Sequence, residues 1–358
     1  MEQLNRRQVS KTGQYYGHGK LLLSGEYFVM DGAKALALPL NLGQGLQVRS
    51  SPSFTPRLHW KSFDVNGNLW FEAHFEFWHF ECLDSTPAPE VLKLQQILRE
   101  VRKINKHFLR DEVDIHVETQ LDFPLNWGLG SSSSLLYVVA QWAYVSPFEL
   151  LFNVEGGSGY DVACAQSNRP ILYQLKGAQP SWQAVDFDPP FKDQLYFIYL
   201  GRKQNSKEAI KNYRQMGPFD RSLVAEVSSL TEQMIAAETL TEFEALIEKH
   251  QELVGTTLEM PQVKQERFFD YWGEVKSLGA WGGDFALVTS HLSHEKTKDY
   301  FMRHGCHTFI PYRQLVLVGK NQLVSADLRD KKPVDYTNIT STYIAQTAVN
   351  STNGQLLH

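Results

Sequence analysis

The chain has 358 residues, of which 42% are hydrophobic and 21% are charged, and its formal net charge is −5. This length predicts two domains, and the composition is typical of a soluble globular protein. The negative charge gives no support to nucleic-acid binding, and no apolar run is long enough to span a membrane. Three scattered cysteines and a polar N-terminal stretch without a signal-peptide core lead us to expect a cytoplasmic protein. A monomer and a homodimer are both left open.

The first half of the sequence is predicted to be rich in strands. Residues 69–78 and 113–117 alternate apolar and polar side chains with a period of two, which is typical of half-buried strands. Between them, residues 89–106 carry apolar residues at helical spacing and predict an amphipathic helix. A further strand is expected at residues 171–175.

The second half is predicted to be more helical. Gly, Pro and Asp residues near 177–190 indicate a domain boundary, which divides the chain into residues 1–185 and 186–358. Thr241 and Glu244 resemble a capping box. The elements expected here are strands at 194–200, 285–289 and 314–318 and helices near 223–234, 241–253 and 295–304. Strands and helices in segregated runs favour an α+β fold over a doubly wound sheet.

The most informative segment is Asn126–Ser134, in which two glycines and four serines precede an apolar run. Glycine allows a tight turn that approaches a ligand closely, and a helix start presents unpaired N–H groups that suit a phosphate. The alternative is a simple helix cap, because serine is a good capping residue. The segment alone leaves both interpretations open.

Three further glycine-bearing segments accompany this loop. In the first, residues 17–29, Lys20 opens an apolar strand, and it is either a functional cation or a surface lysine. In the second, residues 156–165, Asp161 follows a glycine-rich turn, where it either accepts a proton or bonds its own backbone. The third, residues 277–285, is dense in glycine and leads into a strand.

Taken in order, these segments resemble the motifs of the GHMP kinases, a superfamily that includes galactokinase, homoserine kinase, mevalonate kinase and phosphomevalonate kinase. Gly19–Tyr27 resembles the first motif, Pro124–Ser132 the second and Gly279–Asp284 the third. Ser158–Asp161 resembles the catalytic-aspartate segment, and the run Gly-Tyr-Asp-Val-Ala is close to the Gly-Tyr-Asp-Ile-Ala of a bacterial mevalonate and phosphomevalonate kinase subgroup.

The chain also departs from the family pattern. Trp281 stands where the third motif usually has glycine. Mevalonate kinases carry a magnesium-binding glutamate about eleven residues before the aspartate, but this chain has Leu150 there, with Glu149 beside it. The resemblance implies an N-terminal domain like domain 2 of ribosomal protein S5 and a ferredoxin-like C-terminal domain, with the active site between them.

The resemblance also implies roles for individual residues. Lys20 and Asp161 would be catalytic, with Asp161 accepting the proton of the acceptor hydroxyl. Mg²⁺ would bind the Ser132 hydroxyl, and Glu149 is the candidate carboxylate ligand. The ATP phosphates would contact Gly128, Leu129, Gly130, Ser131, Ser132 and Ser133. The acceptor substrate would contact Glu26, Tyr27, Gly279, Ala280, Gly282 and Gly283.

The sequence therefore predicts a small-molecule kinase that uses ATP and Mg²⁺. Mevalonate kinase of isoprenoid precursor biosynthesis is preferred over phosphomevalonate kinase, which would need extra cations such as Arg202 and Lys203 for the substrate phosphate. Another GHMP kinase, a related decarboxylase and a non-catalytic nucleotide-binding relative are the remaining alternatives. Trp127 and Trp281 are expected either to line a pocket or to pack in the core.

Overall fold

The computed structural model describes residues 12–84, 88–110, 113–201, 206–217, 219–279, 281 and 283–319. These residues form two compact units. The first contains residues 12–21, Pro39–Ser167 and Tyr173–Gln183, and the second contains Leu22–Leu38, Asn168–Leu172 and residues 184–319. A single boundary after residue 185 was predicted, whereas the contacts also assign two earlier segments to the second unit.

The larger sheet has seven strands in the order β4-β3-β5-β2-β6-β7, and β1 also pairs with β2. Strand β3 runs parallel to β5, while the pairs β2–β5 and β3–β4 are antiparallel. The strands are β1 (Thr12–Ser24), β2 (Ala35–Pro52), β3 (Leu58–Phe63), β4 (Leu69–Phe75), β5 (Val113–Leu121), β6 (Ile171–Lys176) and β7 (Gln179–Ala184).

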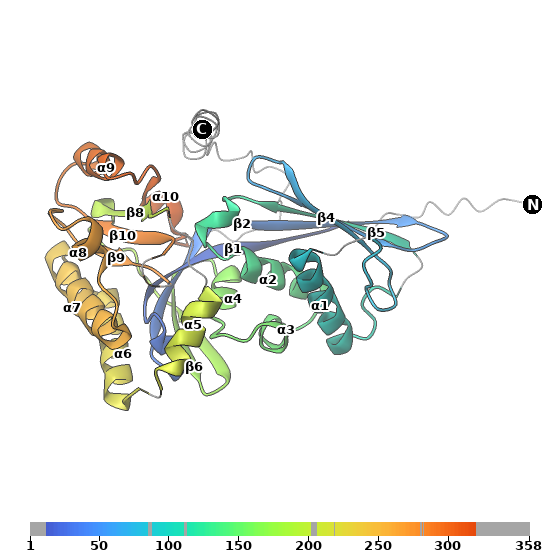
Figure 1. Cartoon of the computed structure of the whole chain (residues 1–358), viewed down its shortest axis with the longest axis horizontal. Helices are drawn as coiled ribbons and strands as arrows, with labels where there is room; N and C mark the ends of the chain where they lie inside the picture. Colours follow the sequence, from blue (N-terminus) through green and yellow to red (C-terminus); the bar gives the residue numbers. More distant parts are fainter. Residues whose placement is uncertain are drawn as a thin grey trace, which may run out of the picture. The chain divides into compact units, whose positions relative to one another are not determined.

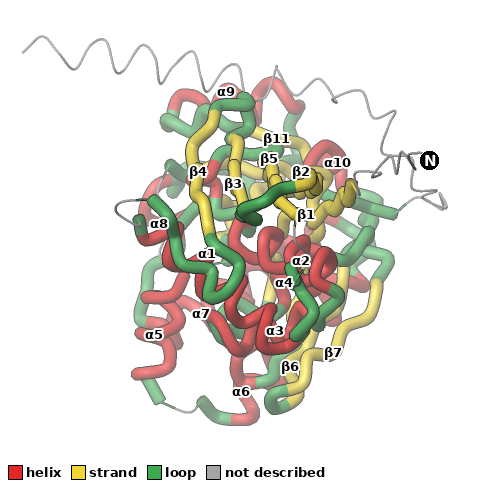
Figure 2. The backbone as a smooth tube through the Cα atoms, turned by 90° about the vertical axis from the view of Figure 1, so that its right-hand side faces the viewer, coloured by secondary structure: helices red, strands yellow, loops and turns green. Residues whose placement is uncertain are grey.

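Helices cover one face of this sheet in the first unit (Figures 1 and 2). They are α1 (Pro89–Ile104), α2 (Ser131–Ala143), α3 (Pro147–Val154) and α4 (Tyr160–Ala165), with the short 3-10 helix η2 (Leu125–Trp127) before α2. Alternation along the strands sends Trp60 and Val117 into the core, where they join Ile97 of α1 and Leu136 of α2. The opposite face of β3, β4 and β5 carries mostly polar side chains, such as His59, Glu72 and Asp114, together with Trp70.

The second unit has a four-stranded sheet in the order β11-β8-β10-β9, with β10 and β11 both antiparallel to β8. Phe301 of α9 packs against one side of this sheet, together with Ile198 and Val288. Its strands are β8 (Leu195–Tyr199), β9 (Val275–Ser277), β10 (Phe285–Thr289) and β11 (Phe309–Pro311). Its helices are η1 (Phe28–Asp31), η3 (Lys192–Gln194), α5 (Ser206–Gln215), α6 (Arg221–Ala236), α7 (Leu240–Leu258), α8 (Val263–Arg267), α9 (His294–Arg303) and α10 (Tyr312–Leu315).

Most of the expected elements are confirmed, as is the α+β class, but three details were wrong. Lys20 was expected to open its strand, whereas it lies inside β1, which begins at Thr12. Residues 314–318 were expected to form a strand, whereas Tyr312–Leu315 form a helical turn that begins after Pro311 and buries Tyr312 and Leu315. Helix α7 is capped by Thr239, whose side chain accepts a hydrogen bond from the Glu242 N–H. This pair lies two residues before the predicted pair, Thr241 and Glu244. In the described part of the chain, no helix has the length and apolar character needed to cross a bilayer.

Candidate active site

A glycine turn leads into helix α2 in the first unit. Gly128 and Gly130 both have left-handed backbones, with φ of 66° and 95°. A Cβ atom on Gly130 would lie 2.9 Å from the Lys20 Cγ and 2.9 Å from the Ser133 Oγ, so a side chain would not fit without movement. Glycine is therefore required at position 130 both for its conformation and for the close approach of Lys20.

The first turn of α2 offers backbone N–H groups to an acceptor. Its N-cap residue is Gly130, which has no side chain to cap them. The Ser133 hydroxyl instead donates to the Gly130 carbonyl at 3.0 Å, and the Ser134 hydroxyl contacts Gln44 at 2.9 Å. A 13-residue helix that begins in this way suits an anion at its N-terminus.

Lys20 of β1 lies along this loop. Its Nζ donates to the Gly128 carbonyl oxygen at 2.9 Å, and its backbone N–H donates to the Leu129 carbonyl oxygen at 2.9 Å. The Nζ is also 5.8 Å from the centroid of the Tyr160 ring. Lys20 thus joins strand β1 to the loop by two hydrogen bonds and lies near the start of α4.

Asp161 lies in the first turn of α4, next to Tyr160. Its side chain is half-buried, and its Oδ1 accepts the Val162 N–H at 3.0 Å. Burial raises the pKa of Asp161, while the charge of Lys20 acts in the opposite direction and lowers it. Lys20, the Gly128–Leu129 backbone and Asp161 are therefore brought together within the first unit.

The two residues expected to bind magnesium have different surroundings. The Ser132 hydroxyl is exposed and accepts from the Lys93 Nζ at 2.8 Å. Glu149 is exposed in the first turn of α3, where its N–H donates to the Ser146 hydroxyl at 3.4 Å. Glu155 lies at the end of α3, with its Oε1 2.5 Å from the same Lys93 Nζ.

Sequence reasoning missed Lys93 and Glu155. Lys93 lies in a charged helix where nothing distinguishes it from its neighbours, whereas Glu155 directly precedes the glycine-rich turn before Asp161. Its negative charge raises the pKa of Asp161, although less than burial does. Ser132 and Glu155 share the Lys93 ammonium as a partner, and their hydroxyl and carboxylate oxygens are hard donors of the kind that Mg²⁺ prefers.

The residues expected to contact the acceptor belong to the second unit. Glu26 is buried, and its carboxylate pairs with Lys276. The Glu26 Oε2 lies 3.4 Å from the His250 Nε2, which also accepts the Gly25 N–H at 3.2 Å. Burial lowers the pKa of His250 well below its ordinary value, so this ring is neutral and Lys276 is the cation that faces Glu26.

Tyr27 is connected to the third motif. The Tyr27 hydroxyl accepts the Trp281 backbone N–H at 2.9 Å, and the Trp281 Nε1 donates to the Pro261 carbonyl at 2.8 Å. Trp281 and Trp127 are 2% and 1% exposed, which means that both pack in the core. Gly279 has a left-handed backbone with φ of 69°, and Gly283 is buried.

Some of the predicted residues lie outside the described part of the chain. These are Ala280 and Gly282 of the third motif, together with Arg202 and Lys203.

Comparison with known proteins gives a result at the level of structure. No family model and no curated protein sequence matches the chain. The structure of L. major mevalonate kinase in complex with R-mevalonate is similar, with a TM-score of 0.59 and 16% identity, over 84% of this chain and 94% of that one. For Streptococcus pneumoniae phosphomevalonate kinase in complex with phosphomevalonate and AMPPNP, the TM-score is 0.58 and the identity 17%, over 82% and 96%.

A galactokinase structure is also similar to this chain. Lactococcus lactis galactokinase complexed with galactose has a TM-score of 0.54 and 11% identity, over 87% of this chain and 94% of that one. At 11% to 17% identity, these similarities show the fold but do not identify a substrate. The chain therefore has the two-sheet α+β fold of the GHMP kinases.

Proposed function

We propose that this protein transfers the γ-phosphoryl group of ATP to the hydroxyl group of a small molecule. The observation that carries the proposal is the position of Lys20, whose Nζ donates to the Gly128 carbonyl oxygen and lies 5.8 Å from the centroid of the ring of Tyr160, the residue before Asp161. A cation and the turn that carries a carboxylate thus lie beside a helix N-terminus that suits phosphate. The GHMP kinase fold over more than four fifths of the chain supports the same conclusion.

The loop Gly128–Ser133 would bind the phosphates of ATP. Phosphoryl transfer depends mainly on positioning and on neutralising charge that spreads over the phosphoryl oxygens. Backbone N–H groups of Ser131, Ser132 and Ser133 would supply part of that neutralisation, because they are held in place before ATP binds. Gly130 allows Lys20 to lie directly against the loop.

Asp161 would act as the general base. It takes the proton of the acceptor hydroxyl while the hydroxyl oxygen attacks the γ-phosphorus and the bond to the bridging oxygen of ADP breaks. Lys20 opposes the effect of burial on Asp161, so it helps to keep this carboxylate ionised. In this scheme Lys20 positions the base and neutralises charge but does not accept a proton.

Ser132 and Glu155 are the residues we propose to hold Mg²⁺, with Glu149 as the alternative carboxylate. When bound, Mg²⁺ would neutralise charge on the phosphate oxygens. Lys93 contacts both Ser132 and Glu155, so it orients the hydroxyl and balances the carboxylate. The same contacts do not extend to Glu149.

We propose mevalonate as the acceptor and phosphomevalonate as the alternative. Similar structures exist in complex with each of these compounds. The acceptor would contact the region of Tyr27 and the third motif, residues Gly279 to Gly283, while Glu26 would act through its pairing with Lys276.

A coupled ADP-release assay tests the proposal. Mevalonate, phosphomevalonate, homoserine and galactose are offered separately with ATP and Mg²⁺, and ADP release with mevalonate is expected. Turnover with phosphomevalonate alone would select the alternative. ATP binding without ADP release for any acceptor would favour a non-catalytic nucleotide-binding protein and contradict the proposal.

A further inference from the structure

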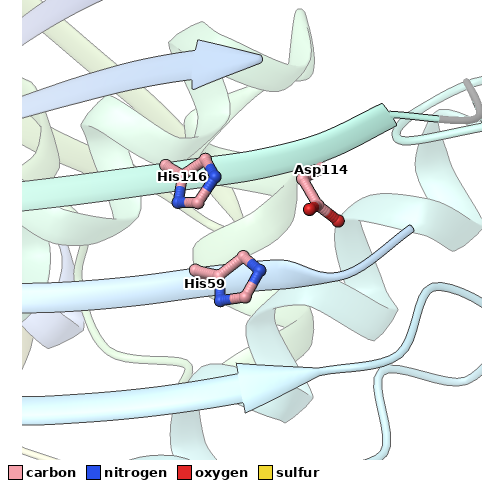
Figure 3. Close-up of side chains that lie close together, drawn as sticks. All are labelled: His59, Asp114 and His116. Atoms are coloured by element: carbon pink, nitrogen blue, oxygen red, sulfur yellow. The ribbon is translucent and has the colours of Figure 1, made fainter. Parts of the chain in front are cut away.

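Three side chains of types that can bind a metal lie together on the polar face of the larger sheet, which the first unit's helices do not cover. They are His59 of β3 and Asp114 and His116 of β5 (Figure 3). One ligand atom from each residue can be chosen so that all three lie within 4.8 Å of one another. Within the described residues, this is the one group of three or more His, Cys, Asp or Glu residues that meets this distance. The proposed kinase chemistry does not use it.

Strand geometry explains why these residues meet. Asp114 and His116 are two residues apart on β5, so their side chains project to the same face. His59 is the direct register partner of His116 across the parallel pair β3–β5. Buried neighbours alternate with them, since Leu58 and Ile115 point into the core on the opposite side.

The geometry points to a divalent cation site. We propose that His59, Asp114 and His116 bind one ion of the zinc class. Two imidazole nitrogens and a carboxylate oxygen are donors that zinc accepts, whereas magnesium and calcium prefer oxygen alone. In a tetrahedral zinc site with bonds near 2.1 Å, ligand atoms are about 3.4 Å apart, so small side-chain rotations would close this trio around the ion. The fourth position would be left to water.

Contacts around the trio orient the ligands. The Arg57 backbone N–H donates to the Asp114 Oδ1 at 2.9 Å, which fixes the carboxylate and leaves its second oxygen for a metal. The His116 Nε2 lies 3.5 Å from the Ser51 hydroxyl. The His59 and His116 rings are stacked, with centroids 4.6 Å apart and planes 9° apart. Such supporting contacts commonly hold metal ligands in orientation.

His74 is the neighbouring residue that most needs to be distinguished from the trio. It is the register partner of His59 on β4, but its Nδ1 lies 3.1 Å from the Asp84 Oδ1. Cys82 also contacts Asp84, at 3.5 Å. A metal bound by His74, Cys82 and Asp84 is therefore the competing arrangement that the experiment must separate.

The test is a zinc titration of the full chain, free of affinity tags and treated with a chelator. Calorimetry should give one zinc ion per chain with a dissociation constant in the micromolar range or below, and thermal unfolding should shift upward with zinc. Loss of a residue that only supports a metal ligand typically weakens metal binding by about 10-fold to 100-fold. H59Q and H116Q each remove a ligand itself, so each should weaken zinc binding by at least this factor. H107Q, which alters an exposed histidine after α1, is the matched control and should bind as wild type does.

Two further measurements keep the result clear. Without zinc, H59Q and H116Q should unfold at the wild-type temperature, because neither side chain belongs to the core. Co²⁺ should give visible absorption bands that H116Q loses. Absence of stoichiometric zinc binding would overturn the proposal, and so would H59Q and H116Q proteins that bind as wild type does. Loss of binding in H74Q with normal binding in H59Q would assign the ion to the competing arrangement and also overturn it.

Discussion

Lys276 and Glu26 form an ion pair in which both side chains are fully excluded from solvent. The Lys276 Nζ also donates to the Ser277 carbonyl at 3.1 Å. Burial lowers the pKa of Lys276 and raises that of Glu26, and each partner opposes the effect on the other. Within the interior of the second unit, each side chain therefore depends on the opposite charge of its partner to stay ionised.

Removing one member of this pair should destabilise the protein strongly. Lys276→Met leaves the Glu26 carboxylate buried without its cation, for which the expected cost is about 3–5 kcal/mol in free energy of unfolding. Urea denaturation measures it. Lys249→Met is the matched control, because the Lys249–Glu226 pair is exposed, and such pairs contribute about 0–1 kcal/mol. The double variant E26Q/K276M should be more stable than K276M, and equal stability would contradict the coupling.

Asp161→Asn should separate catalysis from stability. Loss of a positioned base is expected to lower kcat by about 10²–10⁴-fold. Because burial raises the pKa of Asp161, the ionised carboxylate costs stability at neutral pH, so the free energy of unfolding should stay equal or rise. Steady-state kinetics, nucleotide titration and urea denaturation measure the three properties. Wild-type turnover would remove Asp161 from the mechanism.

The pH dependence of activity should reflect the same carboxylate. A base must be deprotonated, so kcat/KM should fall as pH decreases through a pKa above the ordinary value of aspartate. The effect of Asp161 on stability runs in the opposite direction to its effect on activity. Because its pKa is raised in the folded protein, protonation at low pH favours folding, and this gain is lost as pH rises through the folded-state pKa. A pH–rate profile of the wild type shows the acidic limb. D161N should lack that limb, and a profile identical to wild type would contradict the assignment.

Lys20→Met should lower kcat more than it lowers stability. The variant loses the cation beside Asp161 and the hydrogen bond to Gly128, and a bond of this charged type contributes about 1.5–3 kcal/mol. Comparing the fall in kcat with the change in unfolding free energy tests this. If kcat remains normal, Lys20 is only a structural lysine at the strand.

The proposed magnesium ligands can be distinguished by three variants. Glu155→Gln and Ser132→Ala should raise the Mg²⁺ concentration needed for half-maximal turnover, because each removes an oxygen donor joined through Lys93. Glu149→Gln should leave that concentration unchanged. Turnover is measured against free Mg²⁺ at saturating ATP. The reverse result, with E149Q affected and E155Q normal, would restore Glu149 as the ligand.

The parts of the site that lie within one local segment could be predicted from the sequence. The glycines at 128 and 130 indicate a tight turn, and the serines that follow indicate a helix start, so the loop and α2 are encoded side by side. The partner of Glu26 could not be predicted, because Lys276 lies 250 residues away in the chain. Glu155 was missed because its relation to Ser132 depends on Lys93 of a different helix.

The fold shows the same limit. The amphipathic α1 was predicted because one face of a helix produces a regular apolar spacing. The 18-residue strand β2 was missed because its first half is almost continuously buried and therefore lacks the alternation that identifies a strand. The helical turn at Tyr312–Leu315 replaced an expected strand, because burial of Tyr312 and Leu315 outweighs local β propensity.

The contacts of Trp281 determine when the entropy of fixing this residue is lost. A glycine there would leave the backbone free, whereas the indole is held by the Pro261 carbonyl and the backbone N–H is held by the Tyr27 hydroxyl. The entropy lost in fixing Trp281 is therefore lost when the protein folds and not when a ligand binds. This residue is preorganised, so binding nearby requires less rearrangement than a flexible glycine would impose.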